Sequence, residues 1–536
     1  MNYDSYWEMT GPTLTCPPLT AGTTADVCVV GAGIAGMMTA YHLCREGKSV
    51  IVIDKVGVGS GQTQNTTAHL TNAIDDRYVS IEAWHGSDGA KLAAQSHTAA
   101  IDRIELIAME EGIDCEFTRL DGYLFDSPKD SPNLLNDELR AAHSAGVVVE
   151  PVLHAPLHHY FTGPALKFPR QAQVHPLKLM IGLAAAVLRR GGRIFTQAHA
   201  EGIESVVAES KERTAEVADD QPLLRVKIRG ELSITAKAVV VATNSPFNDM
   251  FAIHTKQAPY LTYVCGFAVP RGSVDKALYW DATNPYHFVR LEDFEPMNVN
   301  GAVLGNPETE QLLLVGGEDH KTGQANDAEA RFSRLATWTK IRFPILGEPR
   351  FRWSGQVMET NDGLAFIGRN PADNPNIYVA TGDSGQGMTH GTIAGMLLSD
   401  LIVGRPNPWA SLYSPSRLTI MAAGRFLEEN LNVAQQFAAW ITPGDVSSVD
   451  LIPKGQGAIV RDGLSKLAVY RDPHGVLHAC SAVCPHLGCL VNWNSNDATW
   501  DCPCHGSRFD SSGHVICGPA HRDLALIKSL AEPVVT

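Results

Sequence analysis

The sequence predicts an α/β chain that ends in a small all-β domain. Two observations lead to this prediction. Near the amino terminus, a glycine-rich turn lies between a buried strand and a helix, and a second strand follows, which is the pattern of a βαβ unit in a Rossmann-type domain. After residue 450 the chain changes to short segments of strand length separated by turn residues, which is typical of a small β domain.

The glycine-rich turn carries Gly31, Gly33 and Gly36 in a GxGxxG spacing. In this spacing the first glycine permits a tight turn, the second lets the backbone approach a pyrophosphate, and the third lets the helix pack closely on the strand. The flanking elements are expected at Asp26–Val30 (strand), about Ile34–Glu46 (helix) and Ser49–Asp54 (strand).

The start of this helix is expected to bind the phosphates of a dinucleotide. Free N–H groups and the positive end of the helix dipole both favour anions there. Asp54 ends the second strand, where its carboxylate can accept hydrogen bonds from ribose hydroxyls. The motif alone leaves FAD and NAD as alternatives. No second strand–GxGxxG–helix unit follows in the sequence, which argues against an additional NAD(P)H site.

The rest of the chain mixes helices, strands and turns. Residues 1–24 are expected to form an extended lead-in, and Trp440–Asp450, rich in Pro, Gly, Ser and Asp, is predicted to be a linker. Helices are expected at Lys91–Glu111, Leu177–Arg190 and about Thr389–Val403, a buried strand at Ala236–Asn244, and hairpin-like loops at Asp472–Gly475 and Asp510–Gly513.

The cysteines are placed unevenly: six of the 11 lie between residues 480 and 517. Such a cluster at one end of a long chain indicates metal or redox chemistry more than a disulfide-stapled secreted fold. Its core is Cys484-x-His486, then fifteen residues, then Cys502-x-x-His505. Two cysteines and two histidines would suit zinc, but that interpretation leaves the two neighbouring cysteines of the cluster without a role.

Three segments resemble the D-amino-acid oxidase-like family of FAD enzymes: Asp54–Thr71, Asn361–Arg369 and Tyr378–Gly395. The resemblance implies an FAD-binding Rossmann-type domain and a mixed-sheet substrate domain. Family members with covalent flavin carry a histidine where this chain has Asn65, and His69 lies further along, so non-covalent FAD is expected. The implied cofactor contacts are Gly31, Gly33, Ile34, Ala35, Gly36, Asp54, Lys55, Gly61, Gln62, Thr66, Thr67, Ala68, Gly382, Gly385, Gly387 and Met388.

"CPHLGC" and "CPCHGS" resemble the two ligand boxes of a Rieske [2Fe–2S] domain. The resemblance implies the ligands Cys484, His486, Cys502 and His505, and a disulfide between Cys489 and Cys504. Because two neutral imidazoles replace two thiolates, the class has raised potentials, about −150 to +300 mV.

The resemblance also assigns residues that tune this cluster. It implies that Ser507 donates to a bridging sulfide and that Gly518–Ala520 forms the covering proline loop. Phe509 stands where respiratory-chain relatives carry a hydrogen-bonding tyrosine, so we expect a potential below that class. Cys480 and Cys517 match no ligand position and are expected to be packed free thiols.

Together the two resemblances predict four segments. They are a lead-in at 1–24, an FAD-dependent oxidoreductase at 25–440, a linker at 441–450 and a Rieske domain at 451–536. Within the second, FAD-binding parts are expected at about 25–80, 165–255 and 350–430, and substrate parts at about 81–164 and 256–349.

The predicted function is oxidation of a small amine or amino-acid-like substrate by hydride transfer to FAD, that is, dehydrogenation of a C–N bond. Single electrons would then pass through the Rieske cluster to an external one-electron carrier or quinone-type acceptor. In one alternative, a partner donates electrons that pass inward through the Rieske cluster to FAD, which then supports a reductase or monooxygenase reaction. Another is a non-catalytic redox sensor or electron carrier.

Residues of the substrate pocket are harder to identify, and no general base is assigned. Arg290 or Arg352 could clamp a substrate carboxylate through two hydrogen bonds. His320 or Tyr263 could orient the substrate. The histidines of "LHAPLHHY" (153–160), His154, His158 and His159, have no accompanying acid or cysteine spacing, so no metal site is expected there.

Bulk properties exclude other classes of function. The net charge of −15 disfavours nucleic acid as a partner. No run of about 18 apolar residues occurs, so no membrane span is expected. The start of the sequence has no signal-peptide pattern, so a cytoplasmic location is predicted.

Overall fold

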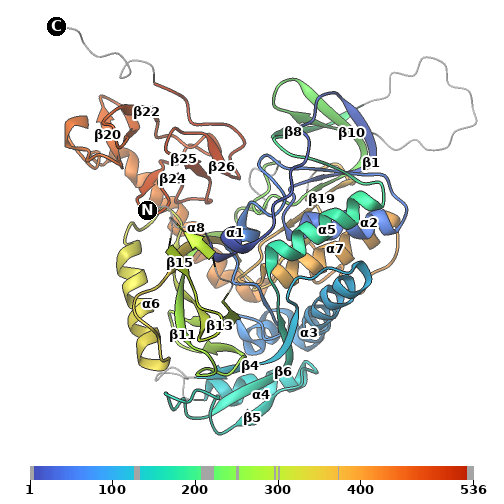
Figure 1. Ribbon diagram of the computed structural model, residues 1–536. Helices are drawn as coiled ribbons and strands as arrows, with labels where there is room; N and C mark the ends of the chain where they lie inside the picture. The colour runs from blue at the N-terminus through green and yellow to red at the C-terminus, as the bar shows by residue number, and fades with distance from the viewer. Residues whose placement is uncertain are drawn as a thin grey trace, which may run out of the picture.

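The computed structural model describes residues 5–125, 133–206, 223–248, 253–294, 297–299, 302–371 and 373–527. These residues form two large sheets with associated helices and a smaller β lobe at the carboxy terminus (Figure 1). Within this part of the chain, no helix has both the length and the apolar character needed to cross a membrane.

The first sheet is a doubly covered, mainly parallel sheet. β1 lies between β2 and β10, and both pairs are parallel, as expected for a βαβ unit. Its strands run in the order β18 (Phe366–Arg369), β19 (Ile377–Thr381), β10 (Leu232–Val241), β1 (Thr23–Val30), β2 (Val50–Ile53) and β7 (Arg193–Phe195). β9 (Leu223–Ile228) pairs with β10, and β8 (Ala200–Val206) pairs with β9.

Helices cover one face of this sheet, and β8 and β9 cover part of the other. Val27 and Val29 of β1 point into the core shared with the helices, whereas Cys28 and Val30 pack with Leu224 and its neighbours. Because both faces are covered, the strand reads as a continuous apolar run. The helices on the first face are α2 (Ile34–Arg45), α5 (Pro176–Arg189) and α7 (Gly387–Val403), and α3 (Arg77–Glu111) packs on α7.

The second sheet is mostly antiparallel and stands beside the first. α6 (Ala328–Arg342) packs on β11 and β16 through Phe332 and Leu335. The strand order is β17 (Phe351–Thr360), β11 (Gln257–Pro270), β16 (Glu310–Lys321), β13 (His287–Asp293), β12 (Leu278–Asp281), β4 (Thr118–Phe125), β6 (Ala165–Gln173) and β3 (His69–Leu70), with β5 (Glu150–Val152) on β6. Nearby lie α4 (Leu134–Ser144) and the pair β14 (Met297–Val299) and β15 (Ala302–Leu304).

The carboxy-terminal lobe contains two small antiparallel sheets. One is β20 (Gln456–Asp462), β21 (Ser465–Arg471) and β22 (Leu477–Ser481); the other is β23 (Asn492–Asn494), β24 (Thr499–Asp501), β25 (Arg508–Asp510) and β26 (Val515–Cys517). Trp493 and Trp500 pack with the clustered cysteines in its core. The sheets of this lobe confirm the prediction of a small all-β domain, and the sheets and helices of the whole chain confirm the predicted α/β class.

The amino-terminal segment differs from the extended lead-in that the sequence predicts. Tyr6–Thr10 forms the short helix α1. Ser5 and Glu8 form a capping box at its start, which satisfies free backbone N–H groups. Trp7 is fully buried, and its indole nitrogen donates to the carbonyl oxygen of Thr66 at 2.6 Å. The segment therefore anchors a loop of the first domain.

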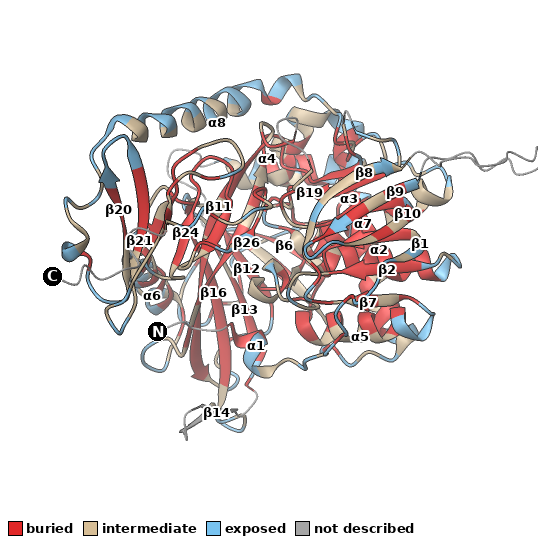
Figure 2. Cartoon of the chain, turned by 90° about the horizontal axis from the view of Figure 1, so that it is seen from above, coloured by how far each residue is buried: buried red, intermediate tan, exposed pale blue. Residues whose placement is uncertain are grey.

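The predicted linker packs along the carboxy-terminal lobe. The Lys466 ammonium donates to the carbonyl oxygens of Ala439 and Pro443, and the backbone N–H of Asp445 donates to Ile459 of β20. The preceding residues form α8 (Ala423–Gln436), which lies across the outer surface with much of its length exposed (Figure 2). Short 3₁₀ turns occur at Gln62–Asn65, Ile420–Ala422, Phe437–Ile441 and Val449–Leu451.

Candidate cofactor and substrate site

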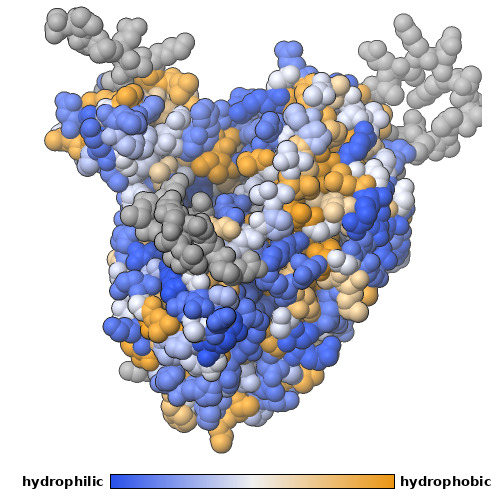
Figure 3. Space-filling view, viewed as in Figure 1, coloured by the Kyte–Doolittle hydropathy of each residue, from blue (hydrophilic) through white to orange (hydrophobic). Residues whose placement is uncertain are grey.

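A cavity of about 450 Å³ lies where the two sheets and the carboxy-terminal lobe meet. Figure 3 shows this face of the molecule hollowed between the lobe and the part that carries β1 and β10. Its wall includes Gly31 and Asp54 of the first domain, Phe288 of the second sheet, and Cys517 of the lobe. One chamber is therefore lined by all three parts of the chain.

The glycine-rich turn forms one end of this cavity. Gly31 has φ +106°, and a side chain there would clash with the carbonyl oxygen of Ala242. A side chain at Gly36 would clash with the carbonyl oxygen of Gly31, so the third glycine allows α2 to approach β1 closely. α2 begins at Ile34 and faces the cavity with its amino terminus. This cradle fits a dinucleotide phosphate.

Asp54 follows β2 at the edge of the cavity. Its carboxylate accepts hydrogen bonds from the backbone N–H groups of Ala32, Val56 and Gly57 at 2.8–3.1 Å. These bonds hold both the glycine-rich turn and the loop after β2. A ribose hydroxyl would meet a carboxylate that the backbone already orients.

Most of the other expected cofactor residues also line the cavity. Two do not: Gly36 packs against Gly31, and Ala68 is fully buried with its carbonyl oxygen bonded to Arg290. Those that line it are Gly31, Gly33, Ile34, Ala35, Asp54, Lys55, Gly61, Gln62, Thr66, Thr67, Gly382, Gly385, Gly387 and Met388.

His69 lines the cavity as well, whereas the side chain at the position of covalent attachment in relatives is Asn65. The His69 ring is held between the Thr67 hydroxyl and the carbonyl oxygen of Val289, at 3.0 and 3.3 Å. Burial lowers the pKa of His69 to about 3, so the ring is neutral.

The four expected cluster ligands come together at one end of the lobe. Cys484 and His486 lie in the loop between β22 and β23, and Cys502 and His505 in the loop between β24 and β25. A hydrogen bond with Cys502, followed by bonds that include the Ser507 hydroxyl, lowers the pKa of the Cys484 thiol. The two sulfurs therefore occupy one buried position suited to a shared metal group.

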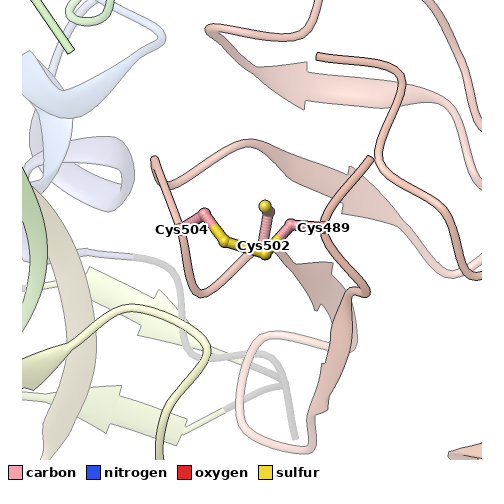
Figure 4. Close-up of side chains that lie close together, drawn as sticks. All are labelled: Cys489, Cys502 and Cys504. Carbon is pink, nitrogen blue, oxygen red and sulfur yellow. A yellow bond between two sulfur atoms is a disulfide. The ribbon is translucent and has the colours of Figure 1, made fainter. Parts of the chain in front are cut away.

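A disulfide between Cys489 and Cys504 ties these two loops together (Figure 4). The same two sulfurs lie within 4.8 Å of the Cys502 sulfur, but disulfide sulfurs are not thiolates and so do not serve as ordinary metal ligands. The disulfide thus leaves Cys484 and Cys502 as the thiols for the cluster. It also accounts for the two cysteines that a zinc site would not need.

The two histidines complete the donor set. The rings of His486 and His505 lie edge to face with centroids 5.0 Å apart. Burial, with a smaller effect of His486, lowers the pKa of His505 to about 4, so His505 is in the neutral form that binds metals. Among the described residues, the buried Nδ1 of His505 has no hydrogen-bond partner. Two thiols and two imidazoles fit a [2Fe–2S] group with mixed ligands.

The lobe is fixed to the flavin side by contacts beside these ligands. Gln356, which lines the cavity, donates through Nε2 to the carbonyl oxygen of Gly506 at 2.8 Å. Its Oε1 accepts from the Cys517 thiol at 3.3 Å. The ring of His254 lies 5.1 Å from that of His486 and 5.9 Å from that of His505. The cluster position and the cavity therefore share a wall.

The expected substrate-clamping residues lie elsewhere. Arg290 is fully buried, pairs with Glu292, and donates to backbone carbonyls of Thr67 and Ala68. Arg352 pairs with Glu329 at the surface. His320 accepts or donates a 2.9 Å bond with Tyr263. None of Arg290, Arg352, His320 and Tyr263 belongs to the described lining of the cavity.

Instead, carboxylates line the part of the cavity next to the second sheet. They are Asp75, before α3; Asp319, on β16; Glu359, on β17; and Asp383, before α7. Burial raises the pKa values of Asp75, Asp319 and Asp383 to about 6, and that of Glu359 well above its usual range. No sequence motif identified them, because they come from four separate segments; only Asp383 lies within a stretch already noted for its glycines.

Comparison with known proteins matches both halves of the chain. Residues 26–401 match the DAO family, FAD dependent oxidoreductase, and residues 441–530 match the Rieske [2Fe–2S] domain. YhfW of Bacillus subtilis (strain 168), described as a Rieske 2Fe-2S iron-sulfur protein, is 31% identical over 98% of this chain and 97% of its own.

Two further comparisons cover the larger half. Gamma-glutamylputrescine oxidoreductase of Escherichia coli (strain K12) is 27% identical over 72% of this chain and 85% of its own. The crystal structure of glycine oxidase from Geobacillus kaustophilus superposes with a TM-score of 0.57 at 18% identity, over 74% of this chain and 99% of that one, which shows a shared fold.

The fold and the two sites define a flavoprotein oxidoreductase that also carries an iron–sulfur centre. The chain belongs to the DAO family of FAD-dependent oxidoreductases and ends in a Rieske [2Fe–2S] domain. Its cofactors are FAD and a [2Fe–2S] cluster, as the sequence motifs predict.

Proposed function

We propose that this protein dehydrogenates a C–N bond of a small amine or amino-acid-like substrate and passes the electrons outward through its Rieske cluster. FAD would take a hydride, and the cluster would carry single electrons to an external one-electron carrier or quinone-type acceptor. The relative from Escherichia coli is named gamma-glutamylputrescine oxidoreductase, and the amine-derived compound in that name supports this substrate class.

The observation that carries the proposal is the wall shared by the cavity and the cluster position. Gln356 lines the cavity and bonds Gly506, the neighbour of the expected ligand His505. Cys517 and Gly518 of the lobe line the same cavity. Electrons leaving the cavity would therefore meet the cluster within the same chain.

The residues of the chain have defined tasks in this reaction. The turn at Gly31 and the start of α2 would hold the cofactor phosphates, and Asp54 the ribose. The rings of Trp280 and Phe288 give the substrate side an apolar wall that limits water. The Ser507 hydroxyl accepts from the N–H of Ala520 at 3.0 Å and bonds Cys484, so it would orient a hydrogen bond towards cluster sulfur.

The order of reduction tests the proposal. The holoenzyme is mixed with amines under anaerobic conditions, flavin absorbance is followed by stopped flow, and the cluster by electron paramagnetic resonance of frozen samples. We expect flavin bleaching first and cluster reduction second. A Cys484→Ser variant, which lacks one cluster ligand, should show only the first phase. Reduction of the cluster before the flavin, or only by an added reduced carrier, would contradict outward flow.

A further inference from the structure

We propose that the substrate is an organic dication, a diamine or longer polyamine without a carboxylate, and that its distal ammonium binds the carboxylates Asp75, Asp319, Glu359 and Asp383. This inference rests on the proposed amine oxidation and adds the charge of the part of the substrate that does not react.

Three of the four carboxylates lie around Tyr286, and the fourth, Asp383, lies near Glu359. The Tyr286 hydroxyl donates to Asp75 at 3.2 Å. The charges of Asp75, Asp319 and Glu359 all raise the pKa of Tyr286, after burial, which places the three within electrostatic reach of its hydroxyl. Asp383 accepts from the backbone N–H of Met358, next to Glu359. All four side chains line the cavity.

Unpartnered acceptors point to a missing donor at this place. Among the described residues, Oε1 of Gln386 has no hydrogen-bond donor, and the Asp319 carboxylate has only the Thr262 hydroxyl near it as a donor. Gln386 is only 5% exposed, lines the cavity, and is held by its Nε2 to the carbonyl oxygen of Ala73 at 2.8 Å. Buried acceptors without donors are rare and costly. An ammonium group brings three N–H donors and a positive charge.

Cationic side chains near this group are already engaged, including Arg331, which acts on Asp319 electrostatically but pairs with Asp327. Arg77 donates to the carbonyl oxygens of Asp75 and Asp281, and Arg425 pairs with Asp76. His390 is bonded to the carbonyl oxygen of Asp383, and burial lowers its pKa to about 4, so it is neutral. The cationic residues of the lining, Lys55 and Arg508, interact with Asp54 and Asp501, at other places in the wall.

Acidic side chains without free cationic partners disfavour a substrate that carries a carboxylate. An amino acid needs a cation for its carboxylate, usually an arginine fork, and the ionised acids of this group would repel it. Trp280, Phe288 and Val264 line the cavity too and offer apolar surface to a carbon chain. A chain with an amine at each end can therefore place one in the carboxylate group and the other against the cofactor.

The chemistry of the reacting end balances with water and the one-electron acceptor class named above. A hydride would leave the carbon beside the neutral amino nitrogen for FAD, and that nitrogen would lose a proton to solvent, so that a C=N bond forms. Water would then add to the C=N bond and release an aldehyde and ammonia. The two electrons would pass one at a time through the cluster to two acceptor molecules. The distal ammonium keeps its charge throughout.

Stopped-flow reduction of the holoenzyme by three matched compounds tests the inference: 1,4-diaminobutane, butylamine and 4-aminobutanoate. The concentration dependence separates the apparent Kd from the limiting rate. We expect 1,4-diaminobutane to bind roughly 10- to 100-fold more tightly than butylamine, as for a hydrogen bond between charged groups. We expect 4-aminobutanoate to bind more weakly than both.

Variants test whether the carboxylates cause the difference in Kd between 1,4-diaminobutane and butylamine. Asp319→Asn keeps the shape and removes the charge, so the Kd of 1,4-diaminobutane should rise roughly tenfold or more while that of butylamine changes little. Asp88→Asn, at an exposed site paired with Lys91, is the matched control and should change neither. Because Asp319 is a desolvated carboxylate, the melting temperature of Asp319→Asn should not fall, which separates lost binding from lost folding.

The outcomes distinguish the two proposals. If 4-aminobutanoate or butylamine reduces the flavin as well as the diamine does, the dication inference is wrong while amine oxidation stands. If Asp319→Asn and Asp88→Asn behave alike, the carboxylates do not bind substrate. If no amine bleaches the flavin, the proposed function and this inference both fail.

Discussion

Nε2 of Gln356 lies 2.8 Å from the carbonyl oxygen of Gly506 and donates a hydrogen bond to it. Gln356 belongs to β17 and to the cavity wall, whereas Gly506 follows the expected cluster ligand His505. Because the same amide also accepts from Cys517, one side chain joins the flavin side to two points of the Rieske lobe.

Replacing Gln356 by leucine should slow electron transfer from flavin to cluster. The change keeps the volume of the side chain and removes both hydrogen bonds between the flavin side and the Rieske lobe. We therefore expect reduction of the cluster to slow about fivefold, the effect of losing about 1 kcal/mol of docking free energy. Ser495→Ala is the control, because Ser495 bonds Asn326 at the exposed edge of the same interface. Equal rates of cluster reduction in the two variants would count against a path through Gln356.

Removing the disulfide should loosen the cluster. The double change Cys489→Ala and Cys504→Ala opens a crosslink between residues 15 apart, which is expected to cost about 3 kcal/mol of unfolding free energy in the lobe. Iron content and visible circular dichroism during denaturant titration would report the loss. Cys480→Ala removes a buried sulfur from the same core without a crosslink, and should retain iron under the same conditions.

Hydrogen bonds near the cluster should set its potential. A donor stabilises the reduced cluster, which carries more negative charge, so removing one lowers the potential. Ser507→Ala should therefore lower it by roughly 50 mV, the equivalent of about 1 kcal/mol in a one-electron couple. Phe509→Tyr should raise it if the new hydroxyl reaches sulfur. Redox titration measures both; a rise for Ser507→Ala would show that its hydroxyl does not donate to the cluster.

Substrate binding should weaken in acid. Burial raises the pKa values of Asp75, Asp319 and Asp383 to about 6, so these carboxylates gain protons as the pH falls through 6 while an alkyl ammonium stays charged. The apparent Kd of a diamine should be nearly constant from pH 7 to 8 and rise below 6. Binding near pH 6 should also release protons, which calorimetry in two buffers of different ionisation enthalpy detects. An affinity that does not change between pH 5 and 8 would mean that these groups do not contact the substrate.

The close approach of α2 to β1 should decide FAD retention. Gly36→Ala places a methyl group against the carbonyl oxygen of Gly31 and pushes the helix start away from the phosphates. We expect a lower ratio of flavin to protein after purification. Gly424→Ala is a matched control in α8, where a side chain meets nothing within 4 Å, and should purify with full flavin content.

Local motifs explain how much of the site was predictable. The GxGxxG turn and the two cysteine–histidine boxes each place several functional residues within a short stretch of sequence. Spacing alone therefore identifies residues such as Gly31, Gly36 and Cys484. The helices and strands around them agree with the expected periodicity, as α2 and β10 show. Comparisons then confirm the family and the two cofactors.

The substrate side was not predictable, because tertiary contacts decide it. Arg290 has the chemistry to bind a substrate carboxylate. Its guanidinium is instead bound by Glu292 and by backbone carbonyls more than a hundred residues away in the sequence. Asp75 and Asp319 are separated by over two hundred residues and meet only when the second sheet folds against the loop before α3. No local sequence pattern indicates that these two residues are close together in the fold.

His254 gives the Rieske lobe a shielded side. It is 2% exposed, and the rings of both expected histidine ligands lie against it. His505 is thus enclosed by the chain's own interior, whereas His486 stays partly exposed. An external carrier would therefore approach the cluster from the flank of the lobe that carries His486.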